Sequence, residues 1–136
     1  MNRKILFRGK DVYTDEWAYG DLHTLCDRPH IHTEETSFPY AGKRSFIKEE
    51  TIGQFTGLYD VCNNPIYEGD IIKSNSIKHL IGYSVEDARF YCIPTRYVGD
   101  VDFERSERAG LDQKWINEFG KVVIGNKWDN PDLLKG

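Results

Sequence analysis

Turn-forming residues divide the run from Glu50 to Lys73 at short intervals, and this punctuation constrains the fold more than any other feature of the chain. Between the turns lie short β-branched and aromatic segments, such as Thr51 to Thr56, that suit half-buried extended chain. Along the whole chain the turn signals recur about every 8 to 12 residues, a spacing typical of all-β sandwiches and barrels. We therefore expect a mainly β (β-rich α+β) protein and not an alternation of parallel strands and helices.

Two asparagines and a proline predict a turn over residues 60–65. Asn63 and Asn64 tolerate left-handed backbone angles, and Pro65 pushes Asn64 out of the helical region. Ile66 and Tyr67 then resume an extended chain. This turn therefore joins two strands.

Glycines mark the other bends of the same run. Gly53 and Gly57 lie where a side chain would obstruct a bulge or a bend, and Gly69 can take a positive φ. The Asp70 carboxylate is placed to accept nearby backbone N–H groups. A Gly-Asp turn, a hydrophobic pair and a hairpin resemble the way in which small SH3-like barrels open a strand. We expect an SH3-like barrel from about residue 51.

The remaining elements follow from turn spacing and apolar periodicity. Helix is scarce, because only Leu111, Trp115 and Phe119 fall on one helical face, while Asn130 and Pro131 can begin a short final helix. The expected topology is a short-stranded meander with one or two short helices, at 111–119 and 130–134. Strands are predicted at Lys4–Arg8, Trp17–Leu25, His30–Glu34, Arg44–Glu49, Gly53–Leu58, Ile66–Tyr67, Asp70–Ser74, His79–Val85, Arg89–Ile93 and Lys121–Gly125.

Length and composition limit how the chain is organised. With 136 residues, of which 39% are hydrophobic, it can build one core but not two comfortable ones. We expect a single unit over 1–136, with lobes at 1–50 (an N-terminal β-hairpin region) and 51–136 (the barrel with the C-terminal helix). No apolar run approaches the roughly 20 residues of a membrane span, and no signal peptide is recognisable. A cytoplasmic protein without membrane contact is expected.

Six short motifs spread over most of the chain carry a family signal, at Ile5–Arg8, Tyr19–Leu22, Thr51–Asp60, Ile66–Ile72, Val123–Asn126 and Asn130–Leu134. Together they resemble the YopX proteins of bacteriophages and prophages. One turn departs from the pattern, because many relatives resemble D-x-N-G and this chain has Asn64 in place of the glycine. The resemblance implies a phage or prophage protein in a bacterial host, and no established activity, substrate or catalytic residue. The positions interpreted as structural are Gly53, Gly57, Asn64, Gly69, Asp70, Gly125 and Asn126.

The segment from Asp21 to His32 collects three of the four histidines, a cysteine and two aspartates. If residues 27–29 turn a hairpin, His30 and His32 point to one face of the returning strand, and His23 or Cys26 can approach from the first. The spacing matches no C-x-x-C or H-E-x-x-H signature, so we expect a solvated hairpin without metal. Cys26, His30 and His32 are the candidate ligands of the alternative, an enzyme or metal site.

No catalytic residue is predicted elsewhere. The three cysteines, Cys26, Cys62 and Cys92, are odd in number and widely spaced, which fits reduced thiols and not a disulfide framework. Among the paired carboxylates, only Asp100 and Asp102 could share a strand face, and they fall in an apparent surface loop. We expect neither catalysis nor a cofactor.

The net charge of −4 argues against nucleic acid as a partner, because affinity for DNA or RNA usually rests on a basic surface. A local basic patch stays open, and with it the alternative of a nucleic-acid-binding barrel. The candidate patch residues are Arg3, Lys4, Arg8, Lys10, Lys43 and Arg44.

Aromatic residues make up 13% of the chain, more than it needs as single residues. Most should fill the core, and a remainder of exposed Tyr and Trp should anchor a protein interface. The expected function is therefore that of a noncatalytic module that binds a phage or host protein or associates with itself.

Overall fold

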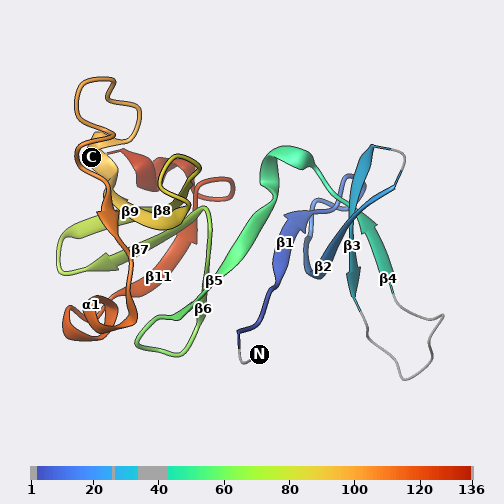
Figure 1. The fold of residues 1–136 in the computed structure, drawn as a ribbon, viewed down its shortest axis with the longest axis horizontal. Helices are drawn as coiled ribbons and strands as arrows, with labels where there is room; N and C mark the ends of the chain where they lie inside the picture. The colour runs from blue at the N-terminus through green and yellow to red at the C-terminus, as the bar shows by residue number, and fades with distance from the viewer. Residues whose placement is uncertain (1–2, 26, 34–42, 136) are drawn as a thin grey trace. The chain divides into compact units, whose positions relative to one another are not determined.

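The computed structural model describes residues 3–25, 27–33 and 43–135, without the side chains of residues 25, 33 and 43. The protein is mainly β, as the turn spacing predicted, with two antiparallel sheets and little helix (Figure 1). It divides into two compact units, Met1–Phe55 (unit 1) and Thr56–Gly136 (unit 2). Among the described residues, no helix has the length and apolar character needed to cross a membrane.

Unit 1 is an antiparallel meander of short strands. Its hydrogen-bonded neighbours follow the order β4-β3-β2-β1, and β1 also pairs with the first residues of β5. A 3₁₀ turn, η1, precedes β5. The bounds of these elements are β1 Phe7–Lys10, β2 Trp17–Leu25, β3 Arg28–Thr33, β4 Lys43–Phe46, η1 Glu49–Thr51 and β5 Gly53–Tyr59.

One face of the unit 1 meander holds a small core. Ile31 and Ile47 are 0% and 3% exposed, and Ser45, which lies opposite Ile31, is buried with them. Gly9 leaves the space that the Ile47 side chain fills, because a Cβ at position 9 would overlap it. Alternate residues of a strand point to opposite faces, so the polar residues between these positions lie on the other face.

Unit 2 contains the rest of β5 beside β6, and a second sheet in the order β10-β9-β8-β7-β11. All pairings within this second sheet are antiparallel. Its elements are β6 Pro65–Tyr67, β7 Asp70–Ser74, β8 Ile77–Ser84, β9 Arg89–Pro94, η2 Thr95–Tyr97, β10 Ala109–Gly110, α1 Gln113–Glu118, β11 Val122–Asn126 and η3 Pro131–Leu134.

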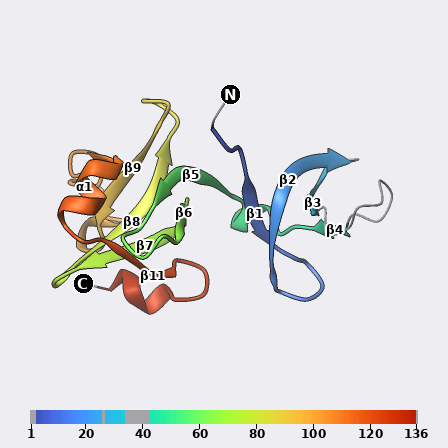
Figure 2. The same ribbon diagram turned by 90° about the horizontal axis from the view of Figure 1, so that it is seen from below.

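Both faces of the second sheet are buried, because apolar residues stand side by side along its strands. Consecutive strand residues point to opposite faces, so each apolar pair contributes to two cores. Ile116 of α1 packs on one face, and Leu133 of η3 packs on the other. Figure 2 shows α1 and the final turn of the chain on opposite sides of the strands of this sheet. The buried strand residues are Ile72, Ile81 and Cys92 on the α1 side and Ile71, Leu80 and Ile93 on the η3 side.

The helix predicted at 111–119 is present as α1. Asp112 caps it, with its side chain accepting a hydrogen bond from the Trp115 backbone N–H at 2.7 Å. The helix ends at Glu118, shortly before Gly120 takes a φ of +61°. The segment predicted at 130–134 forms the single 3₁₀ turn η3, which Pro131 begins.

The closed barrel expected from residue 51 is not detected in the part of the chain that the structure describes. The second sheet is open, with β10 and β11 as its edges. β10 has only two residues and lies beside β9, so it offers little to close a ring. A bulge between Val123 and Gly125 interrupts the register of β11, and bulges twist an edge strand away from further pairing.

Candidate functional site

The strand register of unit 1 gathers polar side chains on the face opposite its core. Residues directly opposite each other in antiparallel strands share a face. His30 of β3 is the centre, because it lies opposite His23 of β2 and Phe46 of β4. We call this surface the histidine face, and its members are Asp21, His23, Arg28, His30, His32, Arg44 and Phe46.

His30 is buried among the other members of the histidine face, with 7% of its surface exposed. Its ring stacks on His23 with centroids 5.4 Å apart and planes at 18°, and it meets Phe46 edge-on at 5.9 Å. Burial lowers the pKa of His30, and the positive charges of His23, Arg44 and His32 lower it further. His30 therefore favours its neutral form inside this cluster.

The imidazole rings are not arranged to share a metal ion. An ion held by a ring nitrogen lies near the plane of that ring, so the nearly parallel rings of His23 and His30 cannot both aim a nitrogen at one ion. His32 meets His23 edge-on, with centroids 6.4 Å apart. No group of three or more His, Cys, Asp or Glu among the described residues is placed to hold a metal, and Cys26 lies outside those residues.

The absence of stoichiometric zinc stays a prediction, and elemental analysis of the purified protein would check it. We expect no equivalent of zinc, because the candidate spacing is weak and two of the rings are stacked. One equivalent of zinc that disappears on His30→Ala combined with His32→Ala would contradict this expectation.

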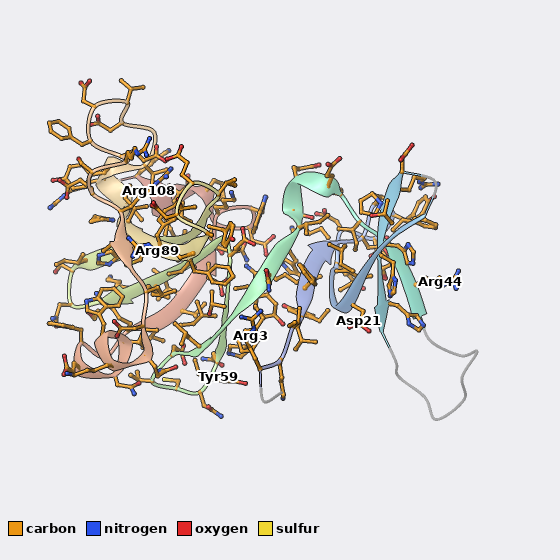
Figure 3. The ribbon with its side chains drawn as sticks, in the orientation of Figure 1. Arg3, Asp21, Arg44, Tyr59, Arg89 and Arg108 are labelled. Atoms are coloured by element: carbon orange, nitrogen blue, oxygen red, sulfur yellow. The ribbon has the colours of Figure 1, made fainter. Side chains whose placement is uncertain are left out.

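Two exposed arginines lie at opposite ends of the histidine face. The Arg28 guanidinium carbon is 4.3 Å from the centroid of the Phe46 ring, a cation–π contact. Arg44, which is labelled in Figure 3, lies opposite His32. Within the described part of the chain, neither guanidinium has a hydrogen bond or an ion pair. Both side chains are exposed.

The same face continues onto β1 and the start of β2, where two of the basic-patch candidates lie. Arg8 and Lys10 approach the Trp17 ring, at 4.6 Å and 5.4 Å from its centroid. The other candidates differ: Arg3 and Lys4 precede β1 and are exposed, and the side chain of Lys43 lies outside the described residues. The sequence therefore identified the basic part of this surface but missed Arg28 and Phe46, which only the strand register reveals.

Two aspartates of the family motifs in unit 2, Asp60 and Asp70, support the backbone. Asp60 is 3% exposed, and its carboxylate accepts hydrogen bonds from the backbone N–H groups of Cys62, Asn64 and Val123 at 2.8–2.9 Å. Burial by itself would raise the pKa of Asp60, but these hydrogen bonds outweigh it and lower the pKa. Asp70, 2% exposed, accepts from the Tyr67 N–H at 2.8 Å.

The structural glycines differ in what surrounds them. Gly57 and Gly69 both have positive φ angles, +86° and +89°. A Cβ at Gly69 would overlap the Trp128 ring, whereas a Cβ at Gly57 would meet nothing within 4 Å. Gly53 begins β5 opposite Arg8, and is buried.

The closing motif folds back onto the turn that contains Gly69 and Asp70. Asn126 lies opposite Asp70, and the Lys127 N–H donates to the Gly69 carbonyl at 2.9 Å. The Asn126 side-chain oxygen accepts from the N–H groups of Trp128 and Asp129 at 3.1 and 2.9 Å. A second glycine is close-packed here, because a Cβ at Gly125 would overlap the Asn130 side chain.

The turn over residues 60–65 uses a different asparagine from the one emphasised in the sequence. Asn63 takes the left-handed conformation, with a φ of +65°, and Asn64 does not. Asn64 instead donates through its backbone N–H and its side chain to Asp60, at 2.8 and 3.1 Å. The departure from the family pattern therefore adds a hydrogen bond to the buried carboxylate.

A group of titratable side chains that the sequence did not single out lies around Trp115 in unit 2. The Lys121 ammonium is 4.8 Å from the Trp115 ring, and the His79 ring meets that ring edge-on at 5.2 Å. Burial, with the charges of Lys121 and Arg96, lowers the pKa of His79 to about 4. Burial also lowers the pKa of Lys121.

Cys92 lies close enough to Lys121 for the two charges to interact, but its environment does not activate it. The residue is 0% exposed, and burial raises the pKa of its thiol to about 11. A nucleophilic cysteine needs the opposite shift, because the thiolate is the reactive form. Cys92 is thus a core thiol. Cys62 is exposed in the turn, and Asp100 accepts hydrogen bonds from backbone N–H groups of its own loop.

Exposed apolar side chains lie on the β8–β9 hairpin and on the loop after η2. An ion pair of 2.6 Å between Glu86 and Arg105 connects the two segments. The three tryptophans are half-buried. Figure 3 labels Arg89 and Arg108 in this part of unit 2. We call the exposed set the hairpin-end group, and it consists of Tyr83, Val85, Val101 and Phe103, which are 42%, 85%, 97% and 51% exposed.

Comparison with known proteins places the chain in a family. The family model described as "YopX protein" matches residues 6–135. Among solved structures, the chain is similar to the crystal structure of protein EF1440 from Enterococcus faecalis, with a TM-score of 0.54 and 24% identity over 98% of this chain and 100% of that chain. A search of curated protein sequences gave no match. The likeness to EF1440 concerns the fold, and the family match over nearly the whole chain shows that this chain belongs to the YopX family.

Proposed function

We propose that this chain is a noncatalytic phage or prophage accessory protein that acts in the cytoplasm of a bacterial host by binding a protein or a second copy of itself. The phage context rests on the YopX resemblance of its motifs.

The hairpin-end group is the observation that carries the proposal. Large apolar side chains on a soluble domain are usually exposed singly, and a set of them on adjoining segments marks an interaction surface. Tyr83 and Phe103 are the aromatic anchors, and each is supported from behind by a second ring. Tyr83 contacts Phe90 with centroids 5.3 Å apart, and Phe103 contacts Tyr97 at 6.2 Å. Aromatic residues held in this way lose little freedom when a partner covers them.

The hydrogen bonds and the burial of the chemically reactive residues in unit 2 support a noncatalytic role. Asp60 and Asp70 are occupied by backbone N–H groups. Cys92 is a buried thiol whose raised pKa keeps it protonated at neutral pH. A catalytic group has to reach a substrate with its pKa matched to the task, and these residues do not meet that condition.

Light scattering coupled to size-exclusion chromatography tests self-association. We expect the wild-type mass to rise with protein concentration, and the double variant Tyr83→Ser plus Phe103→Ser to stay monomeric. Tyr13→Ser is the matched control, because Tyr13 is 78% exposed but lies in unit 1. Circular dichroism would show that all variants stay folded.

A pull-down from a host that carries the phage or prophage tests the protein-partner arm. A captured protein should be retained by Tyr13→Ser and released by the double variant. A wild-type protein that is monomeric at every concentration, and captures nothing that depends on the hairpin-end group, would contradict the proposed function.

A further inference from the structure

We propose that the histidine face of unit 1 binds single-stranded nucleic acid, with Arg28 and Arg44 contacting phosphates and the rings between them stacking on bases. This activity lies on a different unit from the hairpin-end group, so it goes beyond the proposed protein-binding function and does not depend on it. The proposal rests on the charge, the exposed rings and the spacing of the face.

The charge of the histidine face differs in sign from that of the whole chain. With histidines taken as neutral, its charged members are two arginines and one acid, Asp21, whereas the chain carries a net charge of −4. Arg28 and Arg44 are exposed and have no acidic partner among the described residues. Farther along the same side of the sheet, Arg8 is buried against Trp17 and Lys10 pairs with Asp15, so the exposed basic charge of the face comes from Arg28 and Arg44. Net charge averages over surfaces, so an acidic chain can still present a face that complements phosphate.

The rings of the face offer flat surfaces for bases. The exposed His23 ring lies on top of His30, and the Arg28 guanidinium lies over Phe46. Unpaired bases stack on aromatic rings, on histidines and on arginine guanidinium planes. The two stacked pairs are adjacent, because His30 and Phe46 lie directly opposite each other. The His30 and Phe46 rings meet edge-on and His30 is buried, so the outer surfaces of this platform are the His23 ring and the Arg28 guanidinium over Phe46.

The spacing places the platform between the two cations. Arg28 and His32 lie four residues apart on β3, and Arg44 is opposite His32. A strand rises about 3.3 Å per residue, so the two arginines are separated by about 13 Å along the strand, with His30 and Phe46 between them. A backbone can thus contact a cation at each end while its bases lie on the rings.

A single strand fits this surface better than a duplex or an acidic peptide. A duplex shows only base edges, through grooves that admit a helix or a two-stranded ribbon, whereas a sheet face can receive unstacked bases. An acidic peptide would use the arginines but would have no need of the stacked rings. The rings are therefore the feature that favours nucleic acid.

Fluorescence anisotropy with labelled oligonucleotides tests the proposal. The probes are a 12-nucleotide oligo-dT, the matching oligo-rU, a duplex of the same length and a glutamate-rich peptide, each titrated at several salt concentrations. The protein variants are Arg28→Gln plus Arg44→Gln, and Phe46→Leu. The matched control is Arg89→Gln plus Arg96→Gln, because both of those arginines are exposed in unit 2.

We expect the full-length wild type to bind a single strand more tightly than the duplex. Arg28→Gln plus Arg44→Gln should weaken binding at least tenfold and reduce the slope of log K against log salt by about 1.4, at about 0.7 for each phosphate that the variant no longer neutralises. Phe46→Leu should weaken binding about tenfold with little change in that slope, since it removes a stacking surface and no charge. The unit 2 control should bind as the wild type does.

Four outcomes would overturn the proposal. The first is a wild-type protein that binds neither single strand, and the second is a control variant whose affinity falls as far as that of the Arg28 and Arg44 variant. Equal binding of duplex and single strand, with no effect of Phe46→Leu, would mean that charge alone attracts the probe. Tighter binding of the glutamate peptide than of either oligonucleotide would assign the face to an acidic protein partner. Melting curves would establish that each variant is folded, and the two exposed arginines can be replaced without disturbing the unit 1 core.

Discussion

The two sheets of this protein differ in how many of their faces are buried. The second sheet buries both faces, because apolar pairs such as Ile71 and Ile72 place one residue in each of two cores. The unit 1 meander buries one face around Ile31 and Ile47, and the other face carries arginines and histidines. A sheet whose faces are both needed for stability has only its edges and loops left for recognition, whereas a sheet with one free face can use its strands.

The same contrast governs polar residues. In unit 2, Asp60 and Asp70 accept hydrogen bonds inside the structure, and neither is available to a partner. In unit 1, Arg28 and Arg44 project from strands and have no internal acidic partner among the described residues. The motifs that contain Asp60 and Asp70 therefore mark positions that stabilise the fold. The histidine face, which carries the exposed arginines, lies outside these motifs.

The largest effect is expected from Asp60→Ala, which should destabilise unit 2 by about 4 kcal/mol. The substitution removes the buried acceptor of three partly buried backbone N–H groups, including that of Val123, which is distant in sequence. Urea denaturation followed by circular dichroism would measure the change. Asp100→Ala is the control, because Asp100 also accepts backbone N–H groups but in a solvated loop, and it should cost about 0.5 kcal/mol. Equal losses in the two variants would show that burial of Asp60 does not matter.

A pair of glycine variants comes next in size. Gly69→Val should destabilise the protein by about 3 kcal/mol, because a β-branched residue at positive φ is strained and its side chain would overlap Trp128. Gly57→Val has the same strain from a positive φ, but its side chain would overlap no neighbour. Its loss in free energy of unfolding should therefore be about half that of Gly69→Val. The difference between the two melting curves isolates the effect of the Trp128 ring. A Gly69→Val protein that melts within a degree of the wild type would show that the glycine is merely tolerated.

Much of the fold was readable from the sequence, because short β-branched segments between turn residues leave few alternatives to a strand. The strands Trp17–Leu25 and Asp70–Ser74 have the predicted bounds. The elements that were missed, η1, η2 and β10, have two or three residues each, which is too short for a periodicity to appear. The prediction of a closed barrel was wrong. Closure depends on pairing between the two edge strands of a sheet, and no local sequence pattern shows whether they pair.

The candidate surface was only partly predictable, since it depends on register. The sequence placed His30 and His32 on one face, and the structure adds His23 directly opposite His30. The turn predicted at 27–29 was wrong, because Arg28 and Pro29 already belong to β3, where Arg28 pairs with Leu25, and Asp27 before them has a φ of +63°. A shift of one residue moves every side chain of a strand to the other face, so neither Arg28 nor Phe46 could be assigned from sequence alone.

A smaller effect is expected from pH through His79. Its pKa of about 4 lies below the usual 6.5, so the unfolded chain takes up a proton at a higher pH than the folded protein does. Stability should therefore be complete above about pH 6.5 and fall as the pH decreases toward 4, with about 1 kcal/mol lost between pH 7 and pH 5. His79→Gln should show less of this loss in paired urea titrations. Equal slopes for the two proteins, or an NMR titration of the His79 ring with a midpoint near 6.5, would contradict the assignment.

The smallest effect is expected from Asp15→Asn. Asp15 carries a carboxylate as Asp60 does, but it lies on the surface whereas Asp60 is buried. Asp15 pairs with Lys48 at 2.7 Å and Lys10 at 3.7 Å on the surface of unit 1, and its side chain is 60% exposed. The hydrogen bond from Lys48, followed by the charges of Lys10 and Lys48, lowers the pKa of Asp15. A carboxylate with a lowered pKa stabilises the folded protein above its ordinary pKa of 3.8, and this stabilisation is lost as the pH falls through the pKa of the folded state.

The substitution Asp15→Asn does not strain the backbone, because Asn tolerates the φ of +60° found at this position. The melting temperature at pH 7 should therefore change less than in the other variants, and the change should become smaller in 1 M salt, where charges are screened beyond about 3 Å. A large loss that persists in high salt would mean that unit 1 also depends on its acidic residues, and the contrast between the two units would fail.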